Sequence, residues 1–311
     1  MGIVVVGTVF VDVKGFPEGR YIPGGRNAGR IEEVHGGVSR NVAENIGNVE
    51  LRPTFVSLVD ESGSAKAVVD KLVRHKINTD YVKATSDGMG TWLAIFDHTG
   101  EVVASISKRP NLMPMVDLIH ENGDAIFKDC DGITVEIDMD KEIVKEVLFF
   151  AKKYNKPVYA IISNMTIALE RRDFIKETDC FVCNEQEAEM FFYEHYDSLS
   201  PEELAKTLAE KIKAAGIKSM VVTMAEKGAA YATSDGEYGV CKAKKVDVID
   251  TTGAGDAFFS GVSIGLTYGK NLAESCEIGA RIAASVICST ENTCPRFDPK
   301  EFGLTYHSTQ E

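Results

Sequence analysis

Residues 250–261 read Asp250-Thr251-Thr252-Gly253-Ala254-Gly255-Asp256-Ala257-Phe258-Phe259-Ser260-Gly261. The small residues at 253–255 allow a tight turn and a close approach of the backbone to a ligand. The apolar run that follows predicts a buried helix. The turn would then lie at a helix N-terminus, where free N–H groups and the helix dipole attract an anion. Asp256 in the same turn can accept the proton of a hydroxyl group. An acidic helix cap after a flexible turn is the alternative interpretation.

Short β-branched runs alternate with helical patterns along most of the chain. Ile3-Val4-Val5-Val6-Gly7 is typical of a strand that is buried on both faces. Further strands are predicted at Thr54–Val59, Ala125–Phe127, Gly132–Val135, Val158–Ile162, Cys180–Val182 and Met220–Thr223, and helices at Ser64–Lys76, Lys141–Tyr154 and Pro201–Ala215. This alternation predicts an α/β fold with a mostly parallel sheet covered by helices on both sides.

Two segments, at about residues 13–35 and 90–110, interrupt the alternation. Arg20–Asn27 is rich in Gly, Pro and Arg, and the runs Thr91–Asp97 and Glu101–Ser107 have the pattern of a β-hairpin. Because no helices lie beside these strands in the sequence, we expect a small β-sheet lid added to the α/β body. No linker or internal repeat divides the chain, so residues 1–311 are predicted to form one domain.

The chain is acidic, with 34 Lys and Arg residues, 47 Asp and Glu residues and a net charge of −13. Nucleic acid and anionic membranes bind surfaces rich in Lys and Arg, so neither is an expected partner. No apolar stretch approaches the roughly 18 residues that cross a bilayer, and the N-terminus lacks a signal-peptide pattern. Seven scattered cysteines favour reduced thiols, and we interpret Cys180-Phe-Val-Cys183 as part of a buried strand. A cytoplasmic protein is predicted.

A second glycine-rich segment is Gly36-Gly37-Val38-Ser39-Arg40-Asn41-Val42-Ala43. The glycine pair permits close approach of the backbone to a polyol, and Asn41 can both donate to and accept from hydroxyl groups. A tight turn before an amphipathic helix is the alternative. Asp12 follows the first strand at the edge where open α/β sheets bind ligands, and its carboxylate can accept two vicinal hydroxyls. Asp12 could equally be a turn residue.

Together, the two glycine-rich segments resemble the C-terminal and N-terminal signatures of the ribokinase (PfkB-type carbohydrate kinase) family, over essentially the whole chain. The resemblance implies a ribokinase-like doubly wound sheet flanked by helices, with a small β-sheet lid. It also implies ATP-dependent phosphorylation, with Mg²⁺, of an alcohol group on a small sugar or nucleoside. In this family pattern, Asp256 is the catalytic base, the backbone at Gly253, Ala254 and Gly255 forms the anion hole, and the substrate contacts are Asp12, Gly36, Gly37 and Asn41.

Two further segments are similar to the family's nucleotide site. Asn184-Glu185-Gln186-Glu187 resembles an Asn-x-x-Glu motif, which implies that Glu187 holds Mg²⁺ through water and that Asn184 lies near the phosphates. A solvated helix start is the alternative. The segment 221–229 resembles a nucleotide-proximal loop, which implies nucleotide contacts from Thr223, Lys227 and Gly228.

Some positions depart from the family pattern, and others have an equally good structural explanation. The chain departs from the family at Ala225, where glycine is common, and at Ser163-Asn164, where many relatives carry an Asp-Pro pair. The resemblance also implies a monovalent cation such as K⁺, with Asp250, Thr252 and the stretch 289–293 as candidate positions. Ordinary polar groups of turns explain these last residues equally well.

Within the family, the N-terminal third is most similar to members that act on pseudouridine, as are residues 290–293. The favoured hypothesis is therefore phosphorylation of a primary 5′-type hydroxyl of a nucleoside, with pseudouridine first. A pentose or hexose kinase, for ribose or fructose, is the alternative. A non-catalytic protein that senses a sugar or nucleoside is a third hypothesis, against which the intact Asp256 and Glu187 argue.

The lid hairpin is unusually apolar. It carries Trp92, Leu93, Ile95 and Phe96, which is more apolar surface than one face can bury on its own sheet. Since an exposed apolar sheet invites a partner, we predict a homodimer formed through the lid strands.

Overall fold

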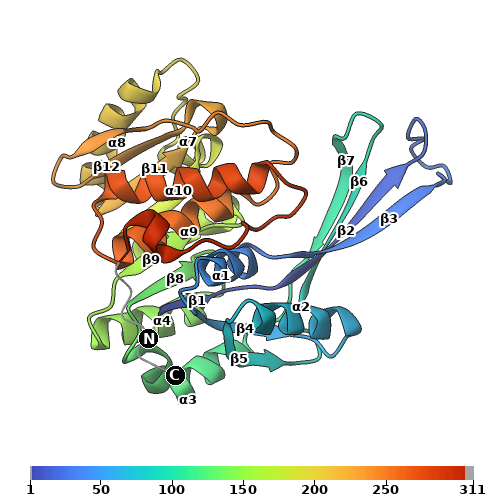
Figure 1. The fold of residues 1–311 in the computed structure, drawn as a ribbon, viewed down its shortest axis with the longest axis horizontal. Helices are drawn as coiled ribbons and strands as arrows, with labels where there is room; N and C mark the ends of the chain where they lie inside the picture. Colours follow the sequence, from blue (N-terminus) through green and yellow to red (C-terminus); the bar gives the residue numbers. More distant parts are fainter. Residues whose placement is uncertain (1, 305–311) are drawn as a thin grey trace.

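The computed structural model describes residues 2–304. In this range, nine strands form one twisted sheet in the order β13-β12-β11-β10-β9-β8-β1-β4-β5 (Figure 1). Strands from β5 through β11 pair in parallel, whereas β12 and β13 are antiparallel. Their bounds are β1 (Ile3–Val6), β4 (Thr54–Val59), β5 (Asn78–Ala84), β8 (Gly132–Glu136), β9 (Val158–Ile161), β10 (Cys180–Asn184), β11 (Ser219–Thr223), β12 (Ala229–Thr233) and β13 (Tyr238–Cys241). The predicted α/β class is confirmed.

Helices cover both faces of this sheet. Successive strand residues point to opposite sides, so each strand places apolar side chains on both faces, and the helices bury them. Val4 and Val6 enter one core, and Ile3 and Val5 enter the other. The first core lies under α3 (Pro114–Phe127), α4 (Lys141–Lys153), α7 (Glu185–Phe192) and α8 (Pro201–Ala215). The second lies under α1 (Val38–Asn48), α2 (Gly63–Arg74), α9 (Ala254–Thr267) and α10 (Leu272–Ile287). The short helices α5 (Met165–Ala168) and α6 (Arg172–Ile175) follow β9.

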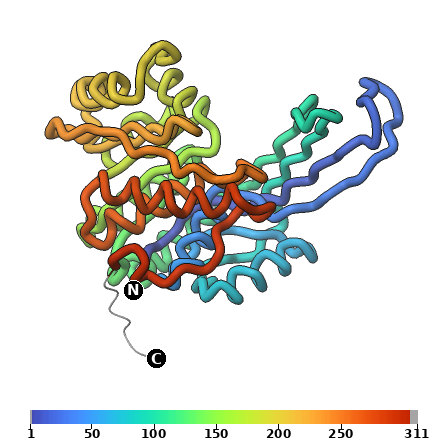
Figure 2. Tube along the Cα trace, turned by 45° about the horizontal axis from the view of Figure 1, so that its top comes forward, coloured from blue at the N-terminus to red at the C-terminus, as the bar shows by residue number. Residues whose placement is uncertain are grey.

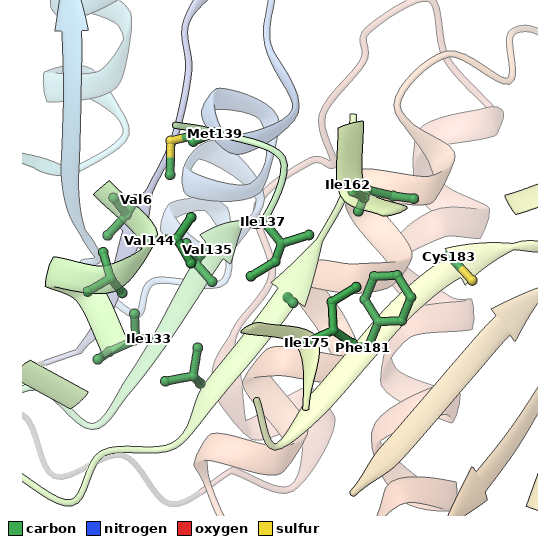
Figure 3. Packing of buried hydrophobic residues seen from close by; sticks show 14 of the residues in the cluster. Val6, Ile133, Val135, Ile137, Met139, Val144, Ile162, Ile175, Phe181 and Cys183 are labelled. Atoms are coloured by element: carbon green, nitrogen blue, oxygen red, sulfur yellow. The ribbon is translucent and has the colours of Figure 1, made fainter. Parts of the chain in front are cut away.

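The first core shows why the central strands are so apolar. Figure 3 shows Val135 of β8 and Phe181 of β10, two strands that lie on either side of β9, with Ile162 just beyond the end of β9. These strands are buried on both faces, so nearly every position is hydrophobic. Cys180 and Cys183 belong to this buried β10, and among the described residues all seven cysteines are free thiols.

One predicted strand was wrong. Ala125–Phe127 forms the last turn of α3, not a strand. A three-residue apolar run fits either structure, and the helix is decided by the buried residues Met115, Leu118 and Ile119 one to three turns earlier.

A second sheet forms the lid, which we define as β2 (Phe10–Pro17), β3 (Gly29–Gly36), β6 (Gly90–Phe96) and β7 (Val102–Lys108). Its strand order is β3-β2-β6-β7, and β6 and β7 pair as the expected antiparallel hairpin. Figures 1 and 2 show the lid projecting from the body, with its free end far from the large sheet. Within residues 2–304, no helix has both the length and the hydropathy needed to span a membrane.

Candidate active site

A single hydrogen bond joins the two glycine-rich segments. Asn41 in α1 donates from Nδ2 to Oδ2 of Asp256 in α9 over 2.7 Å, although the two residues are 215 positions apart. Asn41 is only 5% exposed, and its Oδ1 has no partner in the described structure. A buried acceptor without a donor is costly, so this oxygen is suited to receive a hydroxyl group of a ligand.

Asp256 lies in the first turn of α9, after Gly253. Gly253 has a left-handed backbone with φ of 82°, and a Cβ there would lie 2.2 Å from the carbonyl oxygen of Asn292. At Gly255 a Cβ would meet no atom within 4 Å, so the turn is open on that side. No side chain caps this helix end, which leaves backbone N–H groups of the first turn for an anionic ligand.

The environment of Asp256 tunes its proton affinity. Burial raises the pKa of Asp256 to about 7, and the charges of Glu136 and Asp12 act in the same direction. The hydrogen bond from Asn41 and the charge of Arg40 oppose this increase. A carboxyl with a pKa near neutrality is well matched to general base catalysis at physiological pH.

Close packing around Asp12 explains the glycine pair. A Cβ at Gly36 would lie 2.4 Å from Oδ1 of Asp12, and one at Gly37 would lie 2.7 Å from the carbonyl oxygen of Thr8. Gly37 also has a φ of 98°. Burial raises the pKa of Asp12, against the opposing charges of Lys14 and Arg40. The structure therefore brings Asp12, Gly36, Gly37 and Asn41 to the same place at the root of the lid.

Glu136 was missed by the sequence analysis. It is buried at the carboxyl end of β8, where its Oε2 accepts hydrogen bonds of 3.0 Å from the backbone N–H of Thr8 and from the hydroxyl of Ser39. Burial raises the pKa of Glu136, and the nearby Asp138 adds to the increase. The available signal was its position directly after the predicted strand Gly132–Val135, at the ligand-binding edge of the sheet.

The departures at Ser163-Asn164 have local roles. Ser163 donates from its backbone N–H and its hydroxyl to the carboxylate of Asp138, over 3.0 and 2.8 Å. Asn164 is the N-cap of α5, where its Oδ1 accepts from the N–H of Ile167. Both residues thus organise the loop after β9.

Asn184 and Glu187 satisfy each other in a capping box at the start of α7. Glu187 Oε2 accepts from the backbone N–H of Asn184 over 2.7 Å, and Asn184 Oδ1 accepts from the N–H of Glu187 over 2.9 Å. The helix-start interpretation therefore accounts for the spacing of this pair. Burial raises the pKa of Glu187, as does the charge of Asp138. Asp138 is buried and Glu187 is half-buried, and two carboxylates near one another are a donor set that fits Mg²⁺, so Glu187 and Asp138 could hold the ion.

The other expected nucleotide contacts gather at the ends of β10 and β11. Thr223 pairs with Asn184 in the sheet, and its hydroxyl donates to the carbonyl of Cys183 over 3.4 Å. Lys227 lies 3.5 Å from the carboxylate of Glu185. Gly228 has a φ of 99°. Among the described residues no hydrogen bond connects this group to Asp256, so the expected nucleotide contacts and the Asn41–Asp256 contact form two separate clusters.

Ala225 occupies a left-handed position in the same loop, with φ of 48°. An alanine pays a steric cost there that glycine does not. Because alanine replaces glycine at this left-handed position, the backbone of the loop is locally strained.

Asp250 acts within its own turn. Its Oδ1 accepts from the backbone N–H of Thr252 over 2.8 Å. Burial favours a higher pKa for Asp250, but the hydrogen bonds from Thr252 and Thr251 and the charge of Lys14 together outweigh it, and the pKa is lowered. The turn alone explains both residues, and K⁺ binding stays a prediction.

Several residues of the pseudouridine-like segments are structural. Arg40 and Glu44 form a 2.8 Å ion pair in which both side chains are fully buried, and Thr293 donates to Glu44 over 3.3 Å. The side-chain amide of Asn292 donates to the carbonyl of His35 over 2.9 Å. These contacts attach residues 292 and 293, of which Asn292 packs against Gly253, to β3 and α1.

Comparisons with known proteins agree with this geometry. Residues 2–296 match the sequence model of the pfkB family carbohydrate kinase. The chain is 32% identical to guanosine-inosine kinase of Exiguobacterium acetylicum, over 93% of this chain and 95% of that protein. It is 24% identical to pseudouridine kinase of Escherichia coli (strain K12), over 94% of this chain and 91% of that protein.

Solved structures share the fold. Arabidopsis thaliana ribokinase, complexed with ribose and ATP, has a TM-score of 0.81 at 18% identity, with 96% of this chain and 97% of that chain covered. A Burkholderia thailandensis nucleoside kinase in complex with inosine has a TM-score of 0.74 at 17% identity, with 97% and 94% covered.

Proposed function

The chain belongs to the pfkB family of carbohydrate kinases, and we propose that within this family it is a nucleoside kinase that phosphorylates a 5′-hydroxyl. Its membership confirms the resemblance seen in the sequence, and the protein is a sugar or nucleoside kinase that uses ATP. The observation that carries the proposal is the contact between Asn41 and Asp256, beside Asp12 and the open helix end of α9.

In the proposed mechanism, the substrate lies between Asp12 and Asp256. Asp12 accepts hydrogen bonds from the vicinal ribose hydroxyls, and the free Oδ1 of Asn41 accepts a further hydroxyl. Asp256 accepts the proton of the primary hydroxyl as the hydroxyl oxygen attacks the γ-phosphorus of ATP. The bond from that phosphorus to the β–γ bridging oxygen breaks, and ADP leaves. The N–H groups at 253–255 stabilise the charge on the transferring phosphoryl oxygens. Mg²⁺, which Glu187 and Asp138 would hold, neutralises phosphate charge when it is bound.

The sequence identities to two named relatives rank the candidate nucleosides. The relative at 32% identity is named for guanosine and inosine, and the relative at 24% identity is named for pseudouridine. The greater identity places purine nucleosides before pseudouridine in this proposal. Pseudouridine, the first choice from the sequence, becomes the second candidate.

A substrate screen tests the proposal. ATP consumption is measured with guanosine, inosine, pseudouridine, uridine, ribose and fructose, each with Mg²⁺, and with the Asp256→Asn variant as a control for contaminating kinases. We expect a nucleoside to give a kcat/KM at least tenfold above free ribose, or about 1.4 kcal/mol in transition-state binding. A tenfold preference for a free pentose or hexose would show that the enzyme is a sugar kinase instead.

A further inference from the structure

One face of the lid carries a row of aromatic rings. In the pairing of β2 with β6, Asp12 lies beside Trp92 and Lys14 lies beside Ala94. Residues two apart in a strand share a face, so Phe16 and Phe96 point to the same side as Asp12 and Trp92. Phe16 and Phe96 stack with their ring centroids 4.8 Å apart, and Trp92 meets Phe96 edge-on at 6.4 Å.

This aromatic face is turned toward the site. The carboxylate of Asp12 fills the space next to Gly36, and its negative charge contributes to the raised pKa of Asp256. The opposite face begins against the body, where the hydroxyl of Ser64 in α2 donates to Glu33 of β3. Trp92 is therefore the neighbour of Asp12 on the substrate side of the lid.

The rings are available for contact. Phe16, Trp92 and Phe96 are each only partly buried. The guanidinium of Arg30 lies 4.2 Å from the centroid of Phe16, and a 2.7 Å ion pair holds it to Glu32. The outer end of the row is thus fixed by a cation–π contact, whereas the inner end, at Trp92, adjoins the carboxylate that would bind a sugar.

The position of the row indicates which part of a ligand it meets. With the primary hydroxyl at Asp256 and the vicinal hydroxyls at Asp12, the substituent on the anomeric carbon extends past Asp12 along the lid. A free pentose or hexose carries no aromatic ring there and leaves the lid rings unused. A nucleoside has a planar heteroaromatic base, which stacks on aromatic side chains.

We propose that Trp92 is a specificity residue that stacks on the base of the nucleoside, with Phe96 of the stacked Phe16–Phe96 pair packed edge-on against its ring. The proposal rests on the nucleoside kinase function proposed above. It identifies the base, rather than the ribose, as the part of the substrate that the lid recognises.

Intrinsic fluorescence tests the contact directly, because Trp92 is the only tryptophan of the chain. The full-length enzyme is titrated with inosine, pseudouridine and ribose without ATP, and N-acetyltryptophanamide serves as the inner-filter control. We expect saturable quenching or a spectral shift with the nucleosides and none with ribose. Nucleoside binding that is detected by calorimetry but leaves the Trp92 emission unchanged would overturn the proposal.

Variants test the energetic role. In Trp92→Leu, KM for the nucleoside should rise about tenfold or more, while KM for MgATP stays near the wild-type value. Trp92→Phe should recover part of the loss, because it restores a ring. Phe149→Leu removes an exposed aromatic ring on α4, outside the lid, and should leave every constant unchanged.

The outcomes separate this inference from the proposed function. If nucleosides are phosphorylated but Trp92→Leu has wild-type KM values, the inference is wrong and the nucleoside kinase function stands. Equal loss of activity toward nucleosides and ribose in both Trp92 variants would indicate a structural role for Trp92 and also overturn the inference. If only free sugars are phosphorylated by the wild-type enzyme, the proposed function itself fails.

Discussion

Nδ2 of Asn41 lies 2.7 Å from Oδ2 of Asp256. The amide donates to the carboxylate, stabilises its charged form and so lowers its pKa, whereas burial raises that pKa to about 7. The balance of these two effects determines how much of the enzyme has an ionised Asp256 at a given pH. Since only the ionised carboxylate can accept the proton of the substrate, the Asn41–Asp256 contact predicts a pH dependence of catalysis.

We predict that kcat/KM for the phosphoryl acceptor rises with pH through about 7 and then levels off. A carboxyl is mainly protonated below its pKa and mainly ionised above it. Activity that depends on the ionised form is therefore lost on the acidic side. Initial rates from about pH 5.5 to about pH 9 at saturating MgATP measure the profile. A profile that is flat between about pH 6 and pH 8 would contradict the assignment of Asp256 as the titrating base.

Asn41→Ala provides the control for this profile. Loss of the donated hydrogen bond removes a contribution that lowers the pKa of Asp256, so the acidic limb should move to higher pH. KM for the acceptor should also rise, because the free Oδ1 of Asn41 is lost. At alkaline pH, where Asp256 is ionised in both enzymes, the difference in kcat should narrow.

Asp256→Asn should lower kcat roughly 10²–10⁴-fold. Asparagine keeps the shape of the side chain but cannot take a proton. The proposed anion hole uses backbone groups at 253–255, so the Kd for ATP should change by no more than a few fold. Calorimetric titration beside steady-state kinetics separates the two quantities. Turnover near the wild-type rate would remove Asp256 from the role of base.

Ala225→Gly should increase the free energy of unfolding by about 0.5–1 kcal/mol. The left-handed backbone at Ala225 is strained for alanine, and glycine relieves the strain at a smaller cost in the entropy of the unfolded chain. The matched control is Ala214→Gly, an exposed position in α8, where glycine should destabilise by about 1 kcal/mol. Urea unfolding measures both variants, and the same sign of change in each would refute the explanation.

The lid face opposite Trp92 is apolar and exposed, and we predict that it forms the homodimer interface. Leu93 pairs with Val13 and Ile106, and Leu93, Ile106 and Ile31 are 41, 69 and 78% exposed. Ile106→Glu should therefore convert the dimer to a monomer in light scattering at micromolar concentration. Val246→Glu, at an exposed site outside the lid, should have no effect on the mass. A wild-type monomer with full activity would contradict this prediction.

Local patterns predicted much of the fold. β1 and β11 follow from continuous β-branched and apolar runs, and the turn at Gly253–Asp256 follows from small residues before an apolar helix. The hairpin β6–β7 was also recognised, because two apolar strands flank a short polar turn. The Ala125–Phe127 segment was assigned wrongly, since so short a run does not distinguish a strand from the end of a helix.

The amino-acid sequence by itself determined the α/β class, the lid segments and the chemical types at Asp12, Asn41 and Asp256, because each of these depends on neighbours within a few residues. Only the tertiary structure decided which polar groups meet. Sequence position does not reveal that Asn41 donates to Asp256, or that the buried Glu136 accepts a hydrogen bond from the backbone of Thr8. Nor does it separate Arg40, which pairs with Glu44 in the core, from its neighbour Asn41 in the site. The partner, burial and pKa of a polar side chain depend on segments that become adjacent only when the sheet and its covering helices assemble.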